Sequence, residues 1–117
     1  MAISTGATVT GSGTSVSSVA LTSWTPSAND LILVWVACRS GITATGVSGN
    51  GITFTKVIED LESPQNQCSL SLWRGMSASP SSGQITATLS GTANAAIAVA
   101  HRISGAITTG TNGADAI

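Results

Sequence analysis

The side chains that could carry out acid–base or nucleophilic chemistry are few in this chain. His101 is the single histidine, and it is therefore the only candidate base for a catalytic triad. It shares one face of a strand-like run with Ile97, Val99 and Ile103, which favours a hydrogen-bonded histidine of a core or an interface. Serine hydroxyls are too numerous for any one of them to indicate a nucleophile. We therefore expect a protein that is not an enzyme.

Metal and redox sites also have little support in the sequence. One histidine and two cysteines, Cys38 and Cys68, do not supply the four nitrogen and sulfur ligands of a structural zinc site. Both cysteines lie in apolar strand-like runs and are expected as free, buried thiols, with a disulfide as the alternative if their strands are neighbours. The acidic run Glu59–Glu62 could bind calcium, but it lacks the EF-hand spacing, and a solvated loop is favoured. We predict no metal and no cofactor.

Tryptophan side chains offer a second kind of site, a surface for a glycan or a protein. The run 67–74 alternates, with Cys68, Leu70 and Leu72 on one face and Ser69, Ser71 and Trp73 on the other. Trp73 is thus expected on a polar face, where its ring could stack on a sugar or pack against a neighbouring subunit. Together with Trp35, Arg74 and Glu62 it forms the candidate interaction surface.

Composition narrows the range of partners. Charged residues make up 8% of the chain, against about 25% in an ordinary soluble domain, and the net charge is −1. Neither nucleic acid nor an anionic membrane is expected as a partner, because nothing attracts their charge. A surface with so little charge suits a protein held in an assembly. No signal peptide and no membrane-spanning run is visible, so the chain is expected to be made in the cytoplasm, or to have had a leader removed.

The elements that must position these residues are short strands. Glycine, Ser-Pro and Asn-Asp clusters interrupt the chain at roughly 8–16 residues, and helical periodicity is not sustained. We expect one domain over residues 1–117, with a core of about 16–105 and with 1–15 and 106–117 as candidate flexible arms. Eight strands are predicted, at about 7–10, 16–22, 31–39, 43–48, 52–59, 67–74, 84–90 and 95–104.

Two of these runs carry more specific information. The run Leu31–Cys38 is apolar on both faces, which predicts a central strand whose second face meets a loop or a neighbouring subunit. Asn50-Gly51 between two strand-like runs predicts a type I′ hairpin turn, because that turn requires positive φ at both central residues. A phosphate-binding loop is not favoured there, since a strand rather than a helix follows Gly51.

The order of the segments resembles a β-sandwich module of jelly-roll type that recurs in tailed-bacteriophage virion proteins and in some large bacterial surface proteins. The resemblance covers roughly residues 24–105. It rests on Asn29-Asp30-Leu31, on G-x-x-G-N-G-I-T-F-T at 46–55, on Leu70–Arg74, on Ser82–Gly91 and on Ile103-Ser104-Gly105. It implies a single antiparallel β-sandwich with a structural or adhesive role, and it supplies no catalytic residues.

The resemblance leads to two functional expectations. The first is a bacteriophage capsid decoration (cement) protein that binds the outer shell through the major capsid protein or another virion protein and stabilises contacts between coat subunits. Such a protein is expected to be a homo-oligomer, with a trimer favoured. The alternative is a carbohydrate-binding or adhesin module of a phage tail or fibre, with a glycan as its partner.

Overall fold

The computed structural model describes residues 2–62 and 67–117 and confirms the predicted all-β, antiparallel class. The elements are β1 (Ser4–Ala20), β2 (Leu31–Arg39), β3 (Ala44–Gly49), β4 (Ile52–Leu61), β5 (Cys68–Gly75), β6 (Ile85–Ser104) and the 3-10 helix η1 (Thr111–Ala116). The structure has six strands where eight were predicted. The predicted strands 7–10 and 16–22 are parts of one continuous strand, β1, and the predicted strands 84–90 and 95–104 are parts of another, β6. Most of the stretch 1–15, a candidate arm, is thus part of a paired strand.

The strands form one sheet that closes on itself. Their order is β1-β6-β2-β5-β4-β3, and β3 also pairs with β6. Five strands thus make a closed barrel, and β1 adds to it along β6. This differs from the expected sandwich of two separate sheets. The reason is the length of β6, which pairs with β2 through its C-terminal half and with β3 through its N-terminal half.

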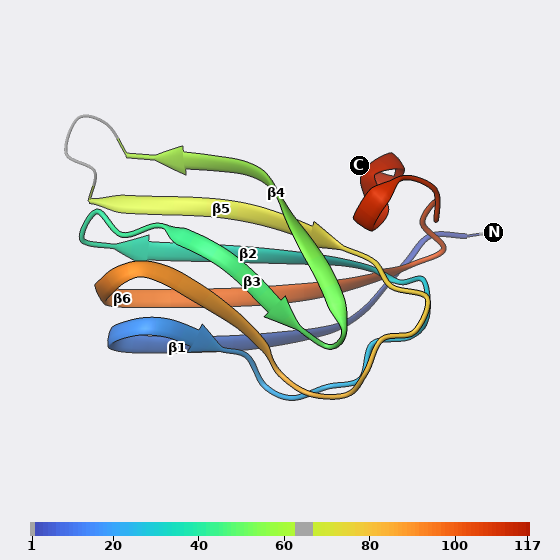
Figure 1. The fold of residues 1–117 in the computed structure, drawn as a ribbon, viewed down its shortest axis with the longest axis horizontal. Helices are drawn as coiled ribbons and strands as arrows, with labels where there is room; N and C mark the ends of the chain where they lie inside the picture. Colours follow the sequence, from blue (N-terminus) through green and yellow to red (C-terminus); the bar gives the residue numbers. More distant parts are fainter. Residues whose placement is uncertain (1, 63–66) are drawn as a thin grey trace.

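The two longest strands, β1 and β6, fold back at the same end of the molecule, so that each contributes to two layers (Figure 1). Ser15 has a φ of 53° at the bend of β1. The pairing register between the two strands is irregular in this region, as expected where a bulge bends a strand. On β6, the buried residues are odd-numbered as far as Ala93 and even-numbered from Ala96 onward. The bend thus keeps one side of β6 on the core in both layers.

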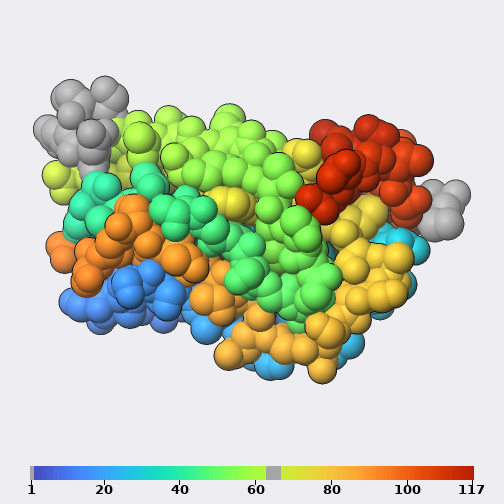
Figure 2. All heavy atoms as spheres, viewed as in Figure 1, coloured from blue at the N-terminus to red at the C-terminus, as the bar shows by residue number. Residues whose placement is uncertain are grey.

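The core lies between these layers and combines large aliphatic side chains with small ones on β6. Figure 2 shows the layer formed by β3, part of β4 and the N-terminal half of β6, with the C-terminal segment packed beside β4. The largest fully buried aliphatic side chains of the core are Leu21, Ile32, Val34, Val36 and Ile85. Leu31 is also buried, but it lies beside Gly113 of η1. From β6, Ala96, Ala98 and Ala100 face inward. Their larger neighbours Ile97 and Val99 therefore face outward.

The inward face of β5 is the opposite of the expected one. Trp73 is 6% exposed, and Ser69 and Ser71 are buried, whereas Leu70 is 45% exposed. Trp73 Nε1 donates a hydrogen bond to Ser71 Oγ at 3.0 Å, and Ser69 Oγ donates one to the Ile42 carbonyl at 2.6 Å. These buried polar groups are thus satisfied within the core. The prediction that Trp73 lies on an exposed polar face is wrong.

The predicted hairpin turn between β3 and β4 is confirmed. Asn50 and Gly51 have φ values of 55° and 63°, as a type I′ turn requires. Asn50 is 4% exposed. Its side-chain amide nitrogen lies within hydrogen-bonding distance of the carbonyl oxygens of Trp24, Ser81 and Gly83, and its Oδ1 accepts a hydrogen bond from Trp24 Nε1. The glycine-rich stretch is therefore a structural corner.

Candidate functional site

The most distinctive surface is the outward side of four neighbouring strands, which we name the outer face. These strands are β6, β2, β5 and β4; β3 crosses in front of β2 in Figure 1, on the other side of the core. Alternate positions along each strand contribute to this face. Its members are Ala95, Ile97, Val99 and His101 of β6, Leu33, Trp35, Ala37 and Arg39 of β2, Cys68, Leu70, Leu72 and Arg74 of β5, and Ile58 and Asp60 of β4, followed by Glu62.

Strand register aligns apolar side chains across the middle of the outer face. Val99 is paired with Trp35, Trp35 with Leu72, and Leu72 with Ile58. Side chains paired in this way on one face of a sheet contact one another. Trp35 is 36% exposed and Ile58 is 60% exposed. The row is thus an apolar strip that is exposed at Trp35 and Ile58 and part-buried at Val99 and Leu72. Contiguous apolar patches of this kind mark interaction sites.

The next row along the strands contains a hollow. Ile97 and Leu70 are 47% and 45% exposed, and Ala37 lies between them in register. A pocket of about 520 Å³ begins beside Ala37 and Ile97 and extends to the end of the face, where residues 12–14 of β1, Ala95, Arg39 and Cys68 line it. An adjoining pocket of about 450 Å³ is lined by Ala37, Asp60, Glu62, Cys68, Ser69 and Leu70.

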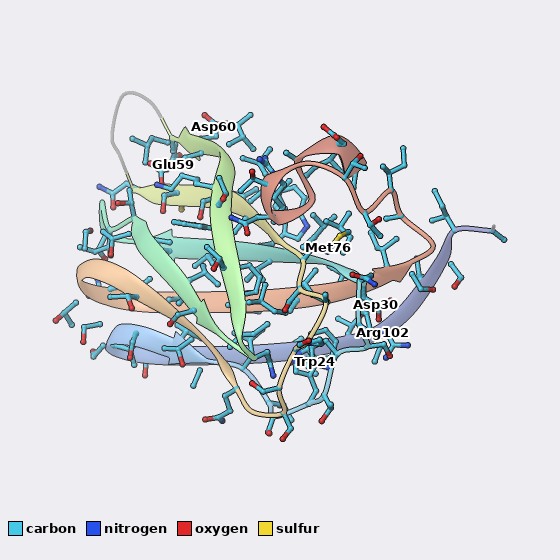
Figure 3. The ribbon with its side chains drawn as sticks, turned by 45° about the vertical axis from the view of Figure 1, so that its right-hand side comes forward. Trp24, Asp30, Glu59, Asp60, Met76 and Arg102 are labelled. Atoms are coloured by element: carbon cyan, nitrogen blue, oxygen red, sulfur yellow. The ribbon has the colours of Figure 1, made fainter. Side chains whose placement is uncertain are left out.

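Charged side chains lie at the two ends of the outer face, and Asp60 of β4 also lies beside Leu70 in the row that contains Ala37. Arg74 is at one end, where its Nε atom is buried and has no hydrogen-bond partner among residues 2–62 and 67–117. Glu62 and Arg39 are at the other end and Asp60 is one row nearer the middle, so two carboxylates in that half of the face accompany one guanidinium. Figure 3 shows Asp60 near the end of β4. The face therefore has a basic end and an opposite half with a net formal negative charge.

Three of the four predicted interaction residues lie on this face. Trp35 is in its central row, and Arg74 and Glu62 are at opposite ends. Trp73 is not part of it, because its side chain is in the core. The exposed aliphatic residues Ile58, Leu70 and Ile97 were not predicted as site residues. The alanine series of β6 is the sequence signal that could have identified Ile97, since small side chains on one face leave the large ones on the other.

The groups that could carry out acid–base chemistry are dispersed or paired. His101 is exposed, and its Nδ1 atom lies 3.3 Å from Thr8 Oγ1 of β1. Asp30 is 5% exposed and forms an ion pair with Arg102 at 2.8 Å, at a distance from Glu59 and Asp60 in Figure 3. Within residues 2–62 and 67–117, no group of three His, Cys, Asp or Glu side chains could hold a metal ion. In those same ranges, no helix is long and apolar enough to cross a bilayer.

The acidic run differs in part from the solvated loop that was expected. Glu59 and Asp60 lie within β4, which ends at Leu61. Glu59 Oε2 is 2.8 Å from Lys56 Nζ, so this carboxylate is already paired. The part of the expected loop at positions 63–66 lies outside the described residues.

The two thiols differ in exposure, which corrects the expectation that both are buried. Both cysteines are free, and they come from neighbouring strands, where Arg39 is paired with Cys68. Cys38 faces the core and is 2% exposed, whereas Cys68 is exposed on the outer face. Burial raises the pKa of the Cys38 thiol, a hydrogen bond with Ser69 lowers it to a smaller extent, and the charge of Glu59 adds a further increase. The thiolate, which is the reactive form, is therefore disfavoured at Cys38.

We expect a thiol reagent such as DTNB to react rapidly with one cysteine of the native protein and with the second only after denaturation. Cys68 is the accessible thiol, while Cys38 is both buried and held protonated. The absorbance of the released thiol gives the count directly. The Cys68→Ser variant is the control and should show no rapid reaction. Two rapid equivalents in the native wild-type protein would contradict the burial of Cys38.

Comparisons of the chain with protein-family models, with curated proteins and with solved structures found no match. The class of protein is thus defined by its own geometry, as an antiparallel β-barrel with one added strand and an apolar outer face. Exposed aliphatic and aromatic side chains, rather than clustered polar ones, distinguish this surface. Such a surface is suited to burial against another macromolecule.

Proposed function

We propose that this chain is a structural virion protein, most simply a capsid decoration protein, that is held against neighbouring protein subunits through the outer face. The observation that carries the proposal is the apolar row of Val99, Trp35, Leu72 and Ile58, in which Trp35 and Ile58 are exposed. An exposed aromatic residue surrounded by aliphatic side chains is typical of the centre of a protein interface. Many copies on one lattice would multiply a modest affinity per contact.

The strand order supports the jelly-roll type within this barrel. Because β1 and β6 fold back and the start of β4 pairs with β3, eight strand segments can be assigned to two layers. One layer has the order 4–14, 95–104, 31–39, 68–75, and the other has the order 18–20, 85–89, 44–49, 52–53. Two four-stranded layers that alternate distant segments in this way have the order of a jelly roll, an architecture of viral capsid and lectin domains.

The surface chemistry favours a protein partner over a glycan. Trp73, the first candidate for stacking on a sugar, is in the core. Trp35 is the tryptophan of the outer face, and its paired neighbours Val99 and Leu72 are aliphatic rather than polar. Sugar binding needs hydrogen-bonding groups beside the aromatic ring, whereas a protein interface needs apolar area. The same reasoning favours a binding role over catalysis.

The proposed function can be tested by sedimentation with capsids. Purified protein is mixed with shells assembled from the major capsid protein of the same genome, and the bound fraction is measured after centrifugation. We expect saturable binding, and about tenfold or weaker apparent affinity for Trp35→Ser, because a central aromatic residue of an interface contributes strongly. Ile107→Ser is the matched control, since Ile107 is 60% exposed but lies outside the outer face.

Two results would contradict this proposal. One is the absence of wild-type protein from sedimented shells. The other is binding that Trp35→Ser and Ile107→Ser weaken equally, because the outer face would then have no special role. Glycan-array binding that is lost in Trp35→Ser, together with no binding to shells, would favour the adhesin alternative.

A further inference from the structure

We propose that Asn112 is a site of spontaneous deamidation, and that Asn50, which is also followed by glycine, is protected from the same reaction by its surroundings. Asn50-Gly51 and Asn112-Gly113 are the two Asn-Gly pairs of the sequence. Asparagine is a thermolabile residue, and it is most labile before glycine, because no side chain hinders the backbone nitrogen that follows it. The inference concerns the C-terminal segment 105–117 and does not depend on the proposed virion role.

The reaction needs only water and the groups of the dipeptide itself. The Gly113 backbone nitrogen, deprotonated by solvent, attacks Asn112 Cγ. A bond from this nitrogen to Cγ forms, the bond from Cγ to Nδ2 breaks, and Nδ2 leaves as ammonia with a proton from water. Water then opens the resulting imide. Cleavage at Cγ gives aspartate, and cleavage at the Asn112 backbone carbonyl carbon gives isoaspartate; both products are carboxylates, and no atom is oxidised or reduced.

The side chain of Asn50 is held away from this reaction. It is 4% exposed, and its Nδ2 atom lies within hydrogen-bonding distance of the carbonyl oxygens of Trp24, Ser81 and Gly83. Its Oδ1 atom accepts the Trp24 Nε1 hydrogen bond. Before the following nitrogen can attack Cγ, the amide must leave these partners, and buried polar groups are then unpaired. The reaction at Asn50 therefore requires the hairpin corner to separate from two other segments of the chain.

Asn112 has a similar backbone conformation but a weaker hold on its side chain. Its φ is 53°, against 55° for Asn50, so this angle does not distinguish the two sites. Asn112 is part-buried, and within residues 2–62 and 67–117 its side chain has one hydrogen bond, from Nδ2 to Thr55 Oγ1 at 3.2 Å. Because η1 belongs to no strand ladder, lifting it from β4 and β5 leaves every pair of strands intact (Figure 1). Segments at the end of a chain open at low cost, so Asn112 is freed more often.

Deamidation at this position would change the basic end of the outer face. Thr55 is paired in register with Arg74, so the new carboxylate is formed close to the strand pair that carries this guanidinium. The aspartate product therefore reduces the basic character of that end. The isoaspartate product lengthens the main chain before Gly113, which is buried with its Cα side facing Leu31; an added Cβ would lie 3.0 Å from Leu31 Cδ1. This product therefore disturbs the cover of Leu31.

The proposal is tested by peptide mapping after the native protein is kept in a mildly alkaline buffer. Cleavage by trypsin at Arg39, Lys56 and Arg102 places Asn50 in the peptide 40–56 and Asn112 in the peptide 103–117. Mass spectrometry then measures the loss of the amide in each peptide over time. We expect Asn112 to react faster than Asn50 by about tenfold or more, because opening is cheaper at the chain end. In urea, where neither side chain is held, the two rates should be similar.

A variant of the hydrogen-bond acceptor tests the role of the local structure. Thr55→Val removes the acceptor of the Asn112 amide with little change in shape, so it should speed deamidation at Asn112 several-fold and leave the rate at Asn50 unchanged. Thr14→Val, which alters an exposed threonine of β1, is the matched control and should change neither rate. The rate at Asn50 also reports whether a variant remains folded, since unfolding would raise it.

Three results would overturn the proposal. The first is an equal rate at the two asparagines of the native protein. The second is a faster reaction at Asn50 than at Asn112. The third is a native protein that keeps the Asn112 amide, and does so also in Thr55→Val, over a period in which the urea-unfolded chain loses it.

Discussion

Replacing Trp73 with alanine is expected to lower the free energy of unfolding by about 3–5 kcal/mol, the range for large aromatic residues deleted from a core. The side chain is 6% exposed and lies between the layers. Its loss leaves a cavity, and it also removes the hydrogen-bond donor to Ser71 Oγ and the ring against which Lys56 Nζ packs at 5.2 Å from the centroid. Equilibrium unfolding in urea, followed by circular dichroism, measures the change.

Trp35→Ala is the matched control, because it removes the same side chain from a neighbouring strand on the outer face. Trp35 is 36% exposed, so its deletion in the monomer should cost well under half as much as that of Trp73. Equal losses for the two variants would mean that Trp73 is not the core tryptophan. The comparison should be made at a concentration below that of any oligomer, since association stabilises the folded state.

The contrast between these two tryptophans shows how far the sequence could lead. Alternation along 67–74 was predicted correctly, but the side facing the core was not. Polarity alone favours Leu70 and Leu72 as core residues and Ser69 and Ser71 as surface residues. The protein does the reverse, because the serines are short, find hydrogen-bond partners and leave room for Trp73. An interface also needs apolar residues, so a strand that is apolar on one side does not by itself reveal which side is inside.

Strand β6 shows a second limit of the same kind. The two predicted strands 84–90 and 95–104 are its two halves, and the bend lies between them. Local residue types therefore located the bend. They could not show that the chain remains paired with β1 through it, or that one half meets β2 and the other β3, because strand partners are distant in sequence. Closure of the barrel depends on these long-range pairings.

The candidate surface was partly predictable for a related reason. The run Leu31–Cys38 is apolar on both faces, and its predicted position as a central strand is confirmed, because β2 lies between β6 and β5. That its second face meets a loop or a neighbouring subunit stays a prediction. Trp35, Arg74 and Glu62 were identified by residue type, but only strand register brings them onto one face. The pocket that begins beside Ala37 could not be anticipated, since its lining comes from β1, β2, β5 and β6, which are distant in sequence.

Replacing Asn50 with alanine is expected to lower the free energy of unfolding by about 2–4 kcal/mol, because it leaves buried polar groups unpaired and also places alanine in a left-handed conformation. Asn50 Nδ2 lies 2.8 Å from the Ser81 carbonyl oxygen and 3.2 Å from the carbonyl oxygens of Trp24 and Gly83. Its Oδ1 accepts the Trp24 Nε1 hydrogen bond at 3.0 Å. One side chain thus joins the hairpin corner to two other segments of the chain.

Two further variants separate the causes of that loss. Asn50→Gly removes the same hydrogen bonds but tolerates a φ of 55°, so it should be more stable than Asn50→Ala by about 1 kcal/mol while remaining well below wild type. Asn50→Asp keeps an acceptor for Trp24 Nε1 but directs a carboxylate at the carbonyl oxygens, so it should recover little. If Asn50→Gly unfolds at the wild-type urea concentration, the hydrogen bonds contribute nothing and the turn needs only positive φ. If it falls with Asn50→Ala instead, the side chain rather than the backbone conformation holds this corner in place.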